Sequence, residues 1–387
     1  MINHIERQLK NIGISIRISS FLPHPSDAER GEAIAEHHAI LLVEPRGETF
    51  AGQLSRLYEA EQMLLNMPEV SGSVPVMKRY FLSDATNQVP LMRADESCAV
   101  SYIQQPPLDG SKIALWVYMT KGMYIHNEEG TTVAEHNGYK HLWRMNMCEN
   151  QGNSAEQTAT LLEKYEQDLA QHGATLADNC IRTWFFVRDV DTQYAGLVKA
   201  RRENFVEQGL TPDTHYIAST GIGGNPADPK ALIQFGAYAI TGLKPEQQRY
   251  LHALTHLNRT IEYGVTFERA TRIEYGDRNH ILVSGTASIN NKGEVVHVGD
   301  IVNQTYRMWE NVEKLLEEGG SSFSDVMQIV VYLRDNADYD IVSRMFAQKF
   351  PDMPYVITLA PVCRPTWLIE MECIAVSDNN SPELQNF

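Results

Sequence analysis

The stretch VNQTYRMWENVEKLLEEGGSSFSDVMQIVVYLRD, residues 302–335, predicts one helix followed by one strand. Apolar residues such as Trp309 and Leu316 recur in its first half at helical spacing, and Gly320 stands where a helix C-cap is expected. Its second half contains IVVYL, which is rich in β-branched and aromatic residues and favours a strand. Residues 155–189, AEQTATLLEKYEQDLAQHGATLADNCIRTWFFVRD, repeat this pattern down to the closing Arg-Asp pair. The chain therefore contains a duplicated helix–strand motif.

A third, weaker copy lies upstream, with a helix expected at 50–67 and a strand at 74–84. Each copy has a Gln near its helix start, and the distance along the chain from this Gln to the closing Asp is 31, 32 and 31 residues in the copies that start from Gln53, Gln157 and Gln304. A strand–loop–strand pattern follows each copy. A second helix fits before this pattern in the second and third copies, whereas the first copy is truncated there.

Each unit thus approximates a β-(β)-α-β-α-β-β pattern, with one or two strands before the first helix, which predicts an α+β fold of β-α-β-α-β type with two helices on one face of a mixed sheet. Three such units in one chain predict pseudo-threefold packing, like a trimer fused into one polypeptide. We expect the units at residues 1–118, 119–242 and 243–387. The alternative is three independent domains in a row, but no Pro/Gly/Ser-rich linker separates the units.

The composition limits the classes of function that this chain can have. The 387 residues carry a formal net charge of −16, from 33 Lys and Arg against 49 Asp and Glu. This charge argues against nucleic-acid binding, although a local arginine cluster can still bind a small anion. Five irregularly spaced cysteines without a C-x-x-C motif favour a reduced, cytoplasmic setting. We expect neither a signal peptide nor a membrane span, because no suitable apolar segment occurs.

The segment APVCRPTWLIEMECIAV, residues 360–376, indicates a turn that leads into an apolar strand. Glu370 and Glu372 lie on one face of that strand. A buried carboxylate costs several kcal/mol unless it is paired or its pKa shifts, so both residues are candidates for function or for ion pairs. At the place of Glu370, the second unit has Gln234 and the first has an apolar residue in ALWVYM. This asymmetry favours Glu370 as a functional proton donor, whereas Glu372 is a supporting residue or an ion-pair partner.

Metal and nucleotide sites are not indicated. His252 and His256 stand four residues apart, a spacing that metal ligands share, but no third ligand lies in register. The segment SGTAS lacks a following helix, so it indicates close backbone packing rather than a phosphate site. We therefore expect no metal and no cofactor.

The third unit resembles the Rid (YjgF-like) family in ILVSGTASINNKGEVV, QTYRMWENVEKLLEEGGSSFSDV, VVYLRD and IEMECIA. The resemblance implies a chorismate mutase-like fold and ligand clefts between units, because Rid proteins are homotrimers. It also implies that an imine deaminase would grip its substrate with an arginine fifteen residues before the strand glutamate. Counting back from Glu370 gives Tyr355, so that arginine is absent.

A closer resemblance joins THYIASTGIGG, EYGVTFERATRIEYGDRNH, SGTAS and PVCRPTWLIEMEC to the chorismatases, over roughly residues 175–376. This resemblance implies that Glu370 is the general acid and that Cys363 lines the substrate ring and helps to decide the product. Gly276 is the expected counterpart of a second product-determining position, which is small in the branch that forms hydroxybenzoate.

The chemistry of chorismate fits these residues. Release of pyruvate requires protonation of the enol methylene carbon, which leaves an oxocarbenium ion for water or the ring hydroxyl to capture. Glu370 suits the proton donor because an apolar setting raises the pKa of a carboxylic acid. Arg364 and Arg269 are candidates to hold the two carboxylates bidentately. Tyr216 and Tyr263 are candidates to donate hydrogen bonds to a carboxylate or to the ring oxygen.

The sequence therefore predicts a cytoplasmic, cofactor-independent enzyme that cleaves chorismate to pyruvate and a hydroxybenzoate or a dihydroxycyclohexadiene carboxylate. Cys363 and Gly276 favour 3-hydroxybenzoate. The expected partner is a small carboxylate rather than a nucleic acid or a membrane. The alternatives are a Rid-type enamine/imine deaminase and a non-catalytic metabolite-binding protein. The oligomeric state stays open, with a monomer as one option because the chain is itself a pseudo-trimer.

Overall fold

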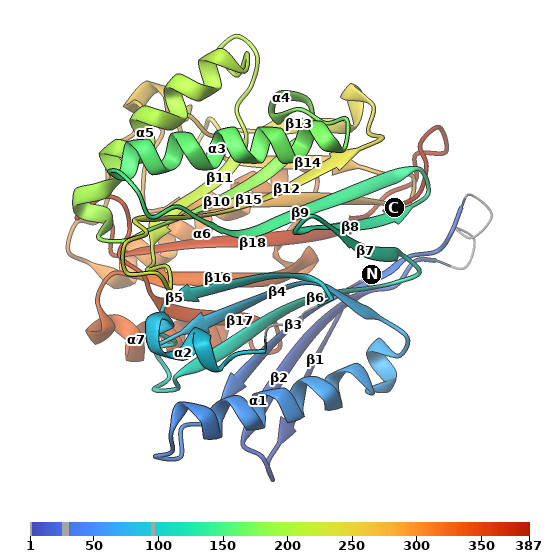
Figure 1. Ribbon diagram of the computed structural model, residues 1–387, viewed down its shortest axis with the longest axis vertical. Coiled ribbons are helices and arrows are strands. Elements are labelled where there is room, and N and C mark those ends of the chain that lie inside the picture. Colours follow the sequence, from blue (N-terminus) through green and yellow to red (C-terminus); the bar gives the residue numbers. More distant parts are fainter. Residues whose placement is uncertain (1, 25–30, 94–96) are drawn as a thin grey trace.

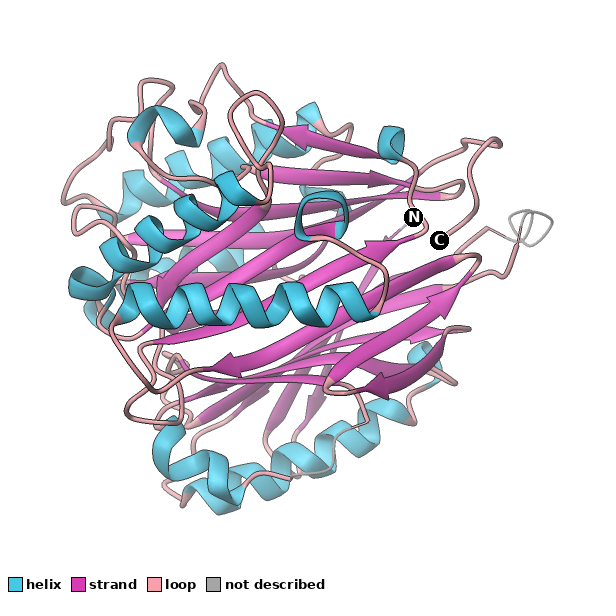
Figure 2. Ribbon diagram, turned by 45° about the horizontal axis from the view of Figure 1, so that its top comes forward, coloured by secondary structure: helices cyan, strands magenta, loops and turns pink. Residues whose placement is uncertain are grey.

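Three six-stranded sheets form the interior of the protein, and the long helices lie on its outside (Figures 1 and 2). The structure is a computed structural model that describes residues 2–24, 31–93 and 97–387. Each sheet with its helices is one unit, and the units are numbered one to three in chain order.

Unit one has the strand order β1-β2-β3-β6-β4-β5. Its elements are β1 (Ile2–Leu9), β2 (Ile14–Phe21), β3 (Ala35–Val43), α1 (Phe50–Leu65), β4 (Val74–Leu82), α2 (Ala85–Gln88), β5 (Ala99–Gln104) and β6 (Ile113–Lys121). The four-residue helix α2 stands where the other units have a long second helix, which confirms the truncation. Residues 94–96 of that segment lie outside the described residues.

Unit two has the order β11-β10-β12-β9-β8-β7, and unit three has the order β13-β14-β15-β18-β16-β17. The elements of unit two are β7 (Tyr124–Glu128), β8 (Thr131–His136), β9 (Tyr139–Cys148), α3 (Ser154–Gln171), α4 (Leu176–Asn179), β10 (Cys180–Val187), α5 (Val190–Glu207), β11 (Ala218–Gly223) and β12 (Ile233–Thr241). The elements of unit three are β13 (Gln248–Leu251), β14 (Ala270–Glu274), β15 (Arg278–Ala287), α6 (Ile301–Glu318), β16 (Val326–Leu333), α7 (Tyr339–Lys349), β17 (Tyr355–Leu359) and β18 (Ile369–Asp378).

Short 3₁₀ turns complete the described elements. They are Pro68–Val70, Val89–Leu91, Pro245–Gln247, Thr260–Tyr263, Phe323–Asp325 and Asn336–Asp338. Within the described residues, no helix is long and apolar enough to cross a membrane.

The repeated helices begin and end as their sequences predict. The Asn153 side chain accepts from the backbone of Glu156 at the start of α3, and the Asp300 side chain accepts from the backbone of Asn303 at the start of α6. Gly173 and Gly320 follow the two helix ends with φ of +67° and +74°. Glycine adopts this left-handed conformation without the steric cost that other residues incur.

The three units pack cyclically. Strand β5 of unit one lies against β9 of unit two, β11 lies against β15 of unit three, and β17 lies against β3 of unit one. Three isolated backbone bridges extend the same pattern beyond the ends of the strands, at Gln104–Asn225, Ile222–Val362 and Pro107–Thr358. This arrangement confirms the α+β pseudo-trimer, in which each unit packs against the other two.

Two details differ from the expectation. The expected boundary after residue 118 falls inside β6, because that strand continues to Lys121 in its pairing with β3. Three strands precede the first long helix in each unit, rather than the one or two strands that the sequence pattern predicts. Outer strands such as β7 (YIHNE) are short and exposed, so they lack the apolar run that marks a buried strand.

Candidate active site

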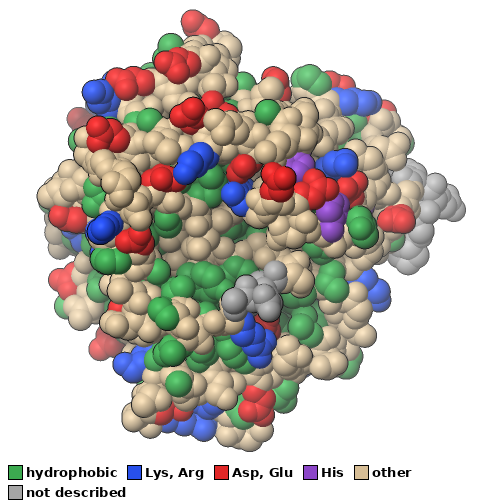
Figure 3. Space-filling view, in the orientation of Figure 1, with side chains coloured by type: hydrophobic (Ala, Val, Ile, Leu, Met, Phe, Trp, Pro, Cys, Tyr) green, Lys and Arg blue, Asp and Glu red, His purple; other side chains and the backbone are tan. Residues whose placement is uncertain are grey.

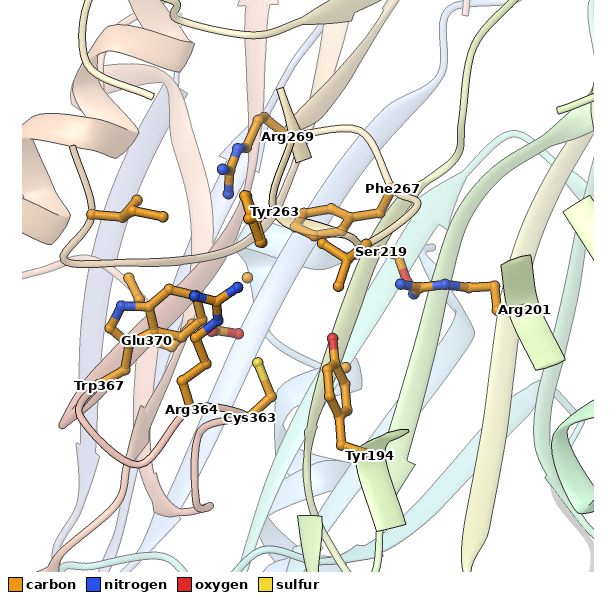
Figure 4. A pocket seen from close by; sticks show the side chains of 15 residues that line it. Tyr194, Arg201, Ser219, Tyr263, Phe267, Arg269, Cys363, Arg364, Trp367 and Glu370 are labelled. Carbon is orange, nitrogen blue, oxygen red and sulfur yellow. The ribbon is translucent and has the colours of Figure 1, made fainter. Parts of the chain in front are cut away.

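A pocket of about 520 Å³, part of it open to solvent, lies at the junction of units two and three. Helix α5 and strand β11 form one wall, and β15, β18 and the turn before β18 form the other. The lining residues are Tyr194, Arg201, Ser219, Gly221, Tyr263, Val265, Phe267, Arg269, Gly285, Ala287, Ile289, Cys363, Arg364, Trp367 and Glu370 (Figure 4). The sequence-predicted residues Glu370, Cys363, Arg364, Arg269 and Tyr263 therefore meet in one place.

Glu370 stands on β18 at the floor of this pocket and is only 5% exposed. Burial, followed by the negative charge of Glu372, raises the pKa of the Glu370 carboxyl to about 8. Arg182 and Arg269 oppose this rise. Because the pKa lies above neutrality, most Glu370 side chains hold a proton at pH 7.

Gly285 of the SGTAS segment lies directly against this carboxyl group. A Cβ atom at position 285 would overlap Oε1 of Glu370 and would lie 2.8 Å from its Cδ. The segment therefore serves close packing, as its sequence predicts, and only glycine leaves room for Glu370.

The pairing of the strands confirms that the three units carry different residues at the position of Glu370. Glu370, Gln234 and Ala114 occupy equivalent positions in β18, β12 and β6. Their partners on the neighbouring strand are Tyr332, Phe186 and Phe81, and each partner precedes the closing Asp of its unit by three residues. Gln234 donates from Nε2 to Ser101 Oγ at 3.2 Å, and both side chains are buried at the junction of units one and two. Unit three alone has a carboxyl group at this position.

Arg201 of α5 brings a buried guanidinium to the pocket. Nη1 donates to Ser219 Oγ at 3.4 Å, while Nε and Nη2 find no hydrogen-bond partner among the described residues. The side chain is 1% exposed. Buried donors without partners are costly, so a carboxylate in the pocket would be a favourable partner for this group.

Arg269 and Arg364 lie on the side of the pocket where Glu370 stands, and Arg201 lies across from them (Figure 4). The Cζ atoms of Arg269 and Arg364 stand 5.3 and 4.8 Å from the centroid of the Tyr263 ring, within cation–π range. Arg269 also donates from Nε and Nη2 to the carbonyl of Asn258 at 3.2 and 3.1 Å, which fixes its position.

The remaining polar groups of the pocket are neutral. Burial raises the pKa of the Cys363 thiol to about 12, and the charge of Glu370 adds to this rise. Burial also raises the pKa of the Tyr263 hydroxyl and holds that of Tyr194 well above its ordinary value. Cys363 therefore presents a protonated thiol, and the two tyrosines present hydroxyl groups that can donate.

Glu372 is an ion-pair partner. It accepts from Arg182 at 2.8 Å, from Arg79 at 3.1 Å, from Thr220 at 2.6 Å and from the Trp184 indole at 3.0 Å. The two arginines lower the pKa of Glu372 against the effect of burial, so its carboxylate stays ionised. Of the two alternatives for Glu372, the ion pair is therefore correct.

Two sequence-predicted site residues lie outside the pocket. The ring of Tyr216 stacks in the core of unit two, with its centroid 6.3 Å from that of Phe205. Gly276 sits in the turn between β14 and β15, where a Cβ would meet the carbonyl of Leu384 at 2.6 Å. The structure therefore does not bring these two residues to the pocket with Glu370, because a match along the chain did not fix which face of the fold they occupy.

The position at which the sequence places the missing Rid arginine also has to be corrected. Tyr355 and Ser219 are equivalent positions on β17 and β11, opposite Ile329 and Thr183 respectively. Because the pocket combines unit three with β11 of unit two, the equivalent position beside Glu370 is Ser219 rather than Tyr355. Ser219 lacks a guanidinium, but that of Arg201 reaches it from α5.

Tyr194 and Arg201 were not among the sequence candidates. They lie seven residues apart in YAGLVKARRENFVEQG, so two turns of helix place them on one face. An arginine on the buried face of a helix was the available signal. It was missed because the segment was interpreted only as the second helix of its unit.

The two histidines at metal-ligand spacing each lie beside a different glutamate. His252 Nδ1 lies 3.3 Å from Glu268, and His256 Nε2 lies 3.1 Å from Glu310. Throughout residues 2–24, 31–93 and 97–387, no group of three or more His, Cys, Asp or Glu side chains is arranged to hold a metal ion.

The chain is similar to known proteins both in sequence and in fold. Residues 268–377 match the family model described as Endoribonuclease L-PSP. The 3-aminoacrylate deaminase RutC of Acinetobacter baylyi is 34% identical over 100 residues, which cover 25% of this chain and 79% of that protein. The 3-hydroxybenzoate synthase of Streptomyces hygroscopicus is 27% identical over 216 residues, which cover 50% of this chain and 63% of that protein.

A crystal structure of a chorismatase has the same fold, with a TM-score of 0.63 and 20% identity over 80% of this chain and 95% of the other. The fold match thus extends well beyond the C-terminal unit. The chain belongs to the Rid family, which includes RutC, and the matching domain is its C-terminal unit.

Proposed function

We propose that this protein cleaves the enolpyruvyl ether of chorismate, with Glu370 as the general acid. The observation that carries the proposal is a buried carboxyl group with a pKa of about 8, set among three guanidinium groups in the cleft between units two and three. A group that is protonated at neutral pH and enclosed among cations suits an acid-catalysed reaction of a dianion. The name of one relative, a chorismatase, supports this substrate, and that of another, a 3-hydroxybenzoate synthase, supports an aromatic product.

In the proposed reaction, the Glu370 carboxyl transfers its proton to the enol methylene carbon of chorismate. The ether oxygen then shares the positive charge of an oxocarbenium ion, which the ionised Glu370 stabilises. If water adds to this ion, the hemiketal collapses, the ether C–O bond breaks, and pyruvate and the ring diol are released. If the neighbouring ring hydroxyl adds instead, a cyclic ketal forms, the ring carbon that bears the ether oxygen loses its proton, and the C–O bond of the former hydroxyl breaks as the ring becomes aromatic. The resulting hemiketal collapses to pyruvate and 3-hydroxybenzoate, whose phenolate takes up the ring proton. The proton lost by the nucleophile restores Glu370.

The cations have separate tasks in this proposal. Arg201, with its unpaired N–H groups, binds one carboxylate on the α5 side of the pocket. Arg364 and Arg269 bind the other near Glu370, and the Tyr263 hydroxyl adds a neutral donor. A bidentate guanidinium on each carboxylate fixes the enol methylene over the acid.

The proposed aromatic product is 3-hydroxybenzoate. The support for this branch is the protonated Cys363 thiol in the pocket wall and the name of the Streptomyces relative. Gly276 no longer supports the choice, because it lies outside the pocket. We also propose a cytoplasmic location, which the five free cysteines support.

The test is a coupled assay of purified protein with chorismate, in which lactate dehydrogenase reports pyruvate. We expect turnover by the wild type and a loss of about 10³-fold or more in Glu370→Gln, since that variant has no proton to donate. Glu61→Gln is a matched control, because it removes a buried carboxylate that pairs with Lys78 in unit one, remote from the pocket. Absence of pyruvate from the wild type, or equal turnover in Glu370→Gln, contradicts the proposal. Chromatography of the aromatic product distinguishes the branches.

A second candidate is Rid-type imine hydrolysis. The observation that favours it is Arg201, whose guanidinium reaches the Ser219 position where the deaminases have their arginine. The deaminase RutC, at 34% identity over part of this chain, is consistent with it. Incubation with an enamine generated in situ, with ammonia release as the readout, separates the two reactions.

A further inference from the structure

The cleft with Glu370 belongs to units two and three, and none of the described residues of unit one lines it. Unit one nevertheless reaches the floor of the cleft through a buried charge cluster. Arg79 of β4 is 0% exposed and donates to Glu372 Oε1 at 3.1 Å. Its Nε and Nη2 have no hydrogen-bond partner within the described residues.

The contacts continue from Glu372 towards Glu370. Thr220 of β11 donates to Glu372 Oε2 at 2.6 Å, and the backbone N–H of Gly285 donates to Thr220 Oγ1 at 2.9 Å. Gly285 is the residue on which the Glu370 carboxyl packs. The five residues therefore form an unbroken path of contacts from unit one to the acid.

The cluster is specific to this side of the pseudo-trimer. Trp116, Gly236 and Glu372 are equivalent positions in the three central strands, and so are Arg79, Trp184 and Val330 on their neighbours. In a trimer of identical units, the three equivalent positions of each set would carry the same side chain. Instead, unit three contributes one carboxylate and unit one contributes Arg79, one of the two arginines that pair with it, while two tryptophans fill the space around them. The Arg79 guanidinium lies 5.1 Å from the Trp116 ring and 4.9 Å from the Trp184 ring.

We infer that Glu372 and Arg79 are positioning residues that set the protonation of Glu370, so that unit one acts as an electrostatic support for the cleft. This inference rests on the proposed role of Glu370 as an acid. Glu372 is ionised and lies two residues from Glu370 on the same face of β18, so its negative charge disfavours a second negative charge there. Arg79 and Arg182 in turn keep Glu372 ionised. Without Arg79, Glu372 would have one cation fewer.

Other charged and titratable groups also face Glu370 and influence its pKa. The cations are Arg182 of β10, Arg201 of α5, Arg269 before β14 and Arg364 in the turn before β18. The neutral titratable groups are Tyr194, Tyr263, Tyr332 and Cys363. Glu372 is the anion among the groups that act on Glu370, so its removal leaves a cationic surrounding.

The experiment is an NMR titration of protein labelled with [δ-¹³C]glutamate, in which the Glu370 signal is the one absent from Glu370→Gln. We expect the apparent pKa of Glu370 to fall by roughly one to two pH units in Glu372→Gln, because a like charge is removed and two arginines lose their counter-ion. In Arg79→Gln we expect the pKa of Glu370 to rise, because a nearby cation is removed while Arg182 still keeps Glu372 ionised. Glu61→Gln, which breaks a buried ion pair of unit one elsewhere, should leave the pKa unchanged.

The opposite directions separate an electrostatic role from a structural one, since general loosening would shift both variants alike. If Glu372→Gln does not fold, the double variant Glu372→Gln/Arg79→Gln removes one charge of each sign, and it should fold with the pKa of Glu370 still lowered. An unchanged Glu370 pKa in Glu372→Gln or in the double variant overturns the inference, as does an equal fall in Arg79→Gln. The titration needs no turnover. A wild type that cleaves no chorismate but shows these shifts would therefore contradict the proposed function and leave the inference intact.

Discussion

Gly285→Ala tests how closely Glu370 must be held. A methyl group at this position overlaps Oε1 of Glu370, lies 2.8 Å from its Cδ and lies 3.1 Å from Cγ2 of Thr220. Ordinary carbon contacts begin at about 3.4 Å, so the carboxyl must move by roughly 0.6 Å or more. Misplacement of a catalytic group by about 1 Å costs on the order of 10²-fold in rate. Overpacking of this kind costs about 1–3 kcal/mol of stability.

We therefore expect Gly285→Ala to lose about 10²-fold in kcat/KM for pyruvate release while it stays folded at 25 °C. Gly319→Ala is the matched control, because its methyl group overlaps the end of the Ile281 side chain and lies 3.0 Å from Leu251, away from the pocket. The control should lose stability without a comparable loss of rate. Both variants are compared by thermal melting and by the coupled pyruvate assay. A Gly285→Ala enzyme with wild-type kcat/KM would refute the packing of Glu370 on Gly285.

Three further outcomes follow from other parts of the structure. Burial lowers the pKa of His38 and of His136 to about 3, so each is neutral in the folded protein but titrates near 6.5 when unfolded. Stability should therefore fall as the pH drops below 6.5, by about 2 kcal/mol per histidine between pH 7 and 5, as urea unfolding will measure. Arg201→Met should raise KM for chorismate by at least tenfold at unchanged melting temperature, and an unchanged KM would contradict its role. Because its pKa is about 12, Cys363 should resist iodoacetamide at pH 8, as mass spectrometry will report.

The threefold architecture was predictable because each copy keeps its helix, its strand and a Gln-to-Asp spacing of 31 or 32 residues. The polar outer strands were not predictable, since an edge strand such as β7 needs no continuous apolar face. Glu370 was predictable as well. A carboxylate in an apolar strand, absent from the equivalent strands, marks a departure from packing rules that function can explain.

The composition of the pocket was only partly predictable, because the cleft lies between units. Ser219 and Arg201 come from unit two, and their nearness to Glu370 depends on how β11 packs against β15. Counting along unit three instead led to Tyr355, whose ring lies under Arg17 of unit one. Gly276 failed for a similar reason, since a motif match fixes the order of residues but not the surface that each one faces.

The most direct test of the central claim is the pH dependence of kcat for pyruvate release between pH 6.5 and 9.5. Glu370 acts as an acid in its protonated form, which is present below its pKa and lost above it. We predict a rate that is constant up to about pH 7.5 and then falls tenfold per pH unit above about pH 8, with no such fall in the residual rate of Glu370→Gln. A rate that rises through pH 8, or a fall that persists unchanged in Glu370→Gln, would contradict the assignment of Glu370 as the proton donor.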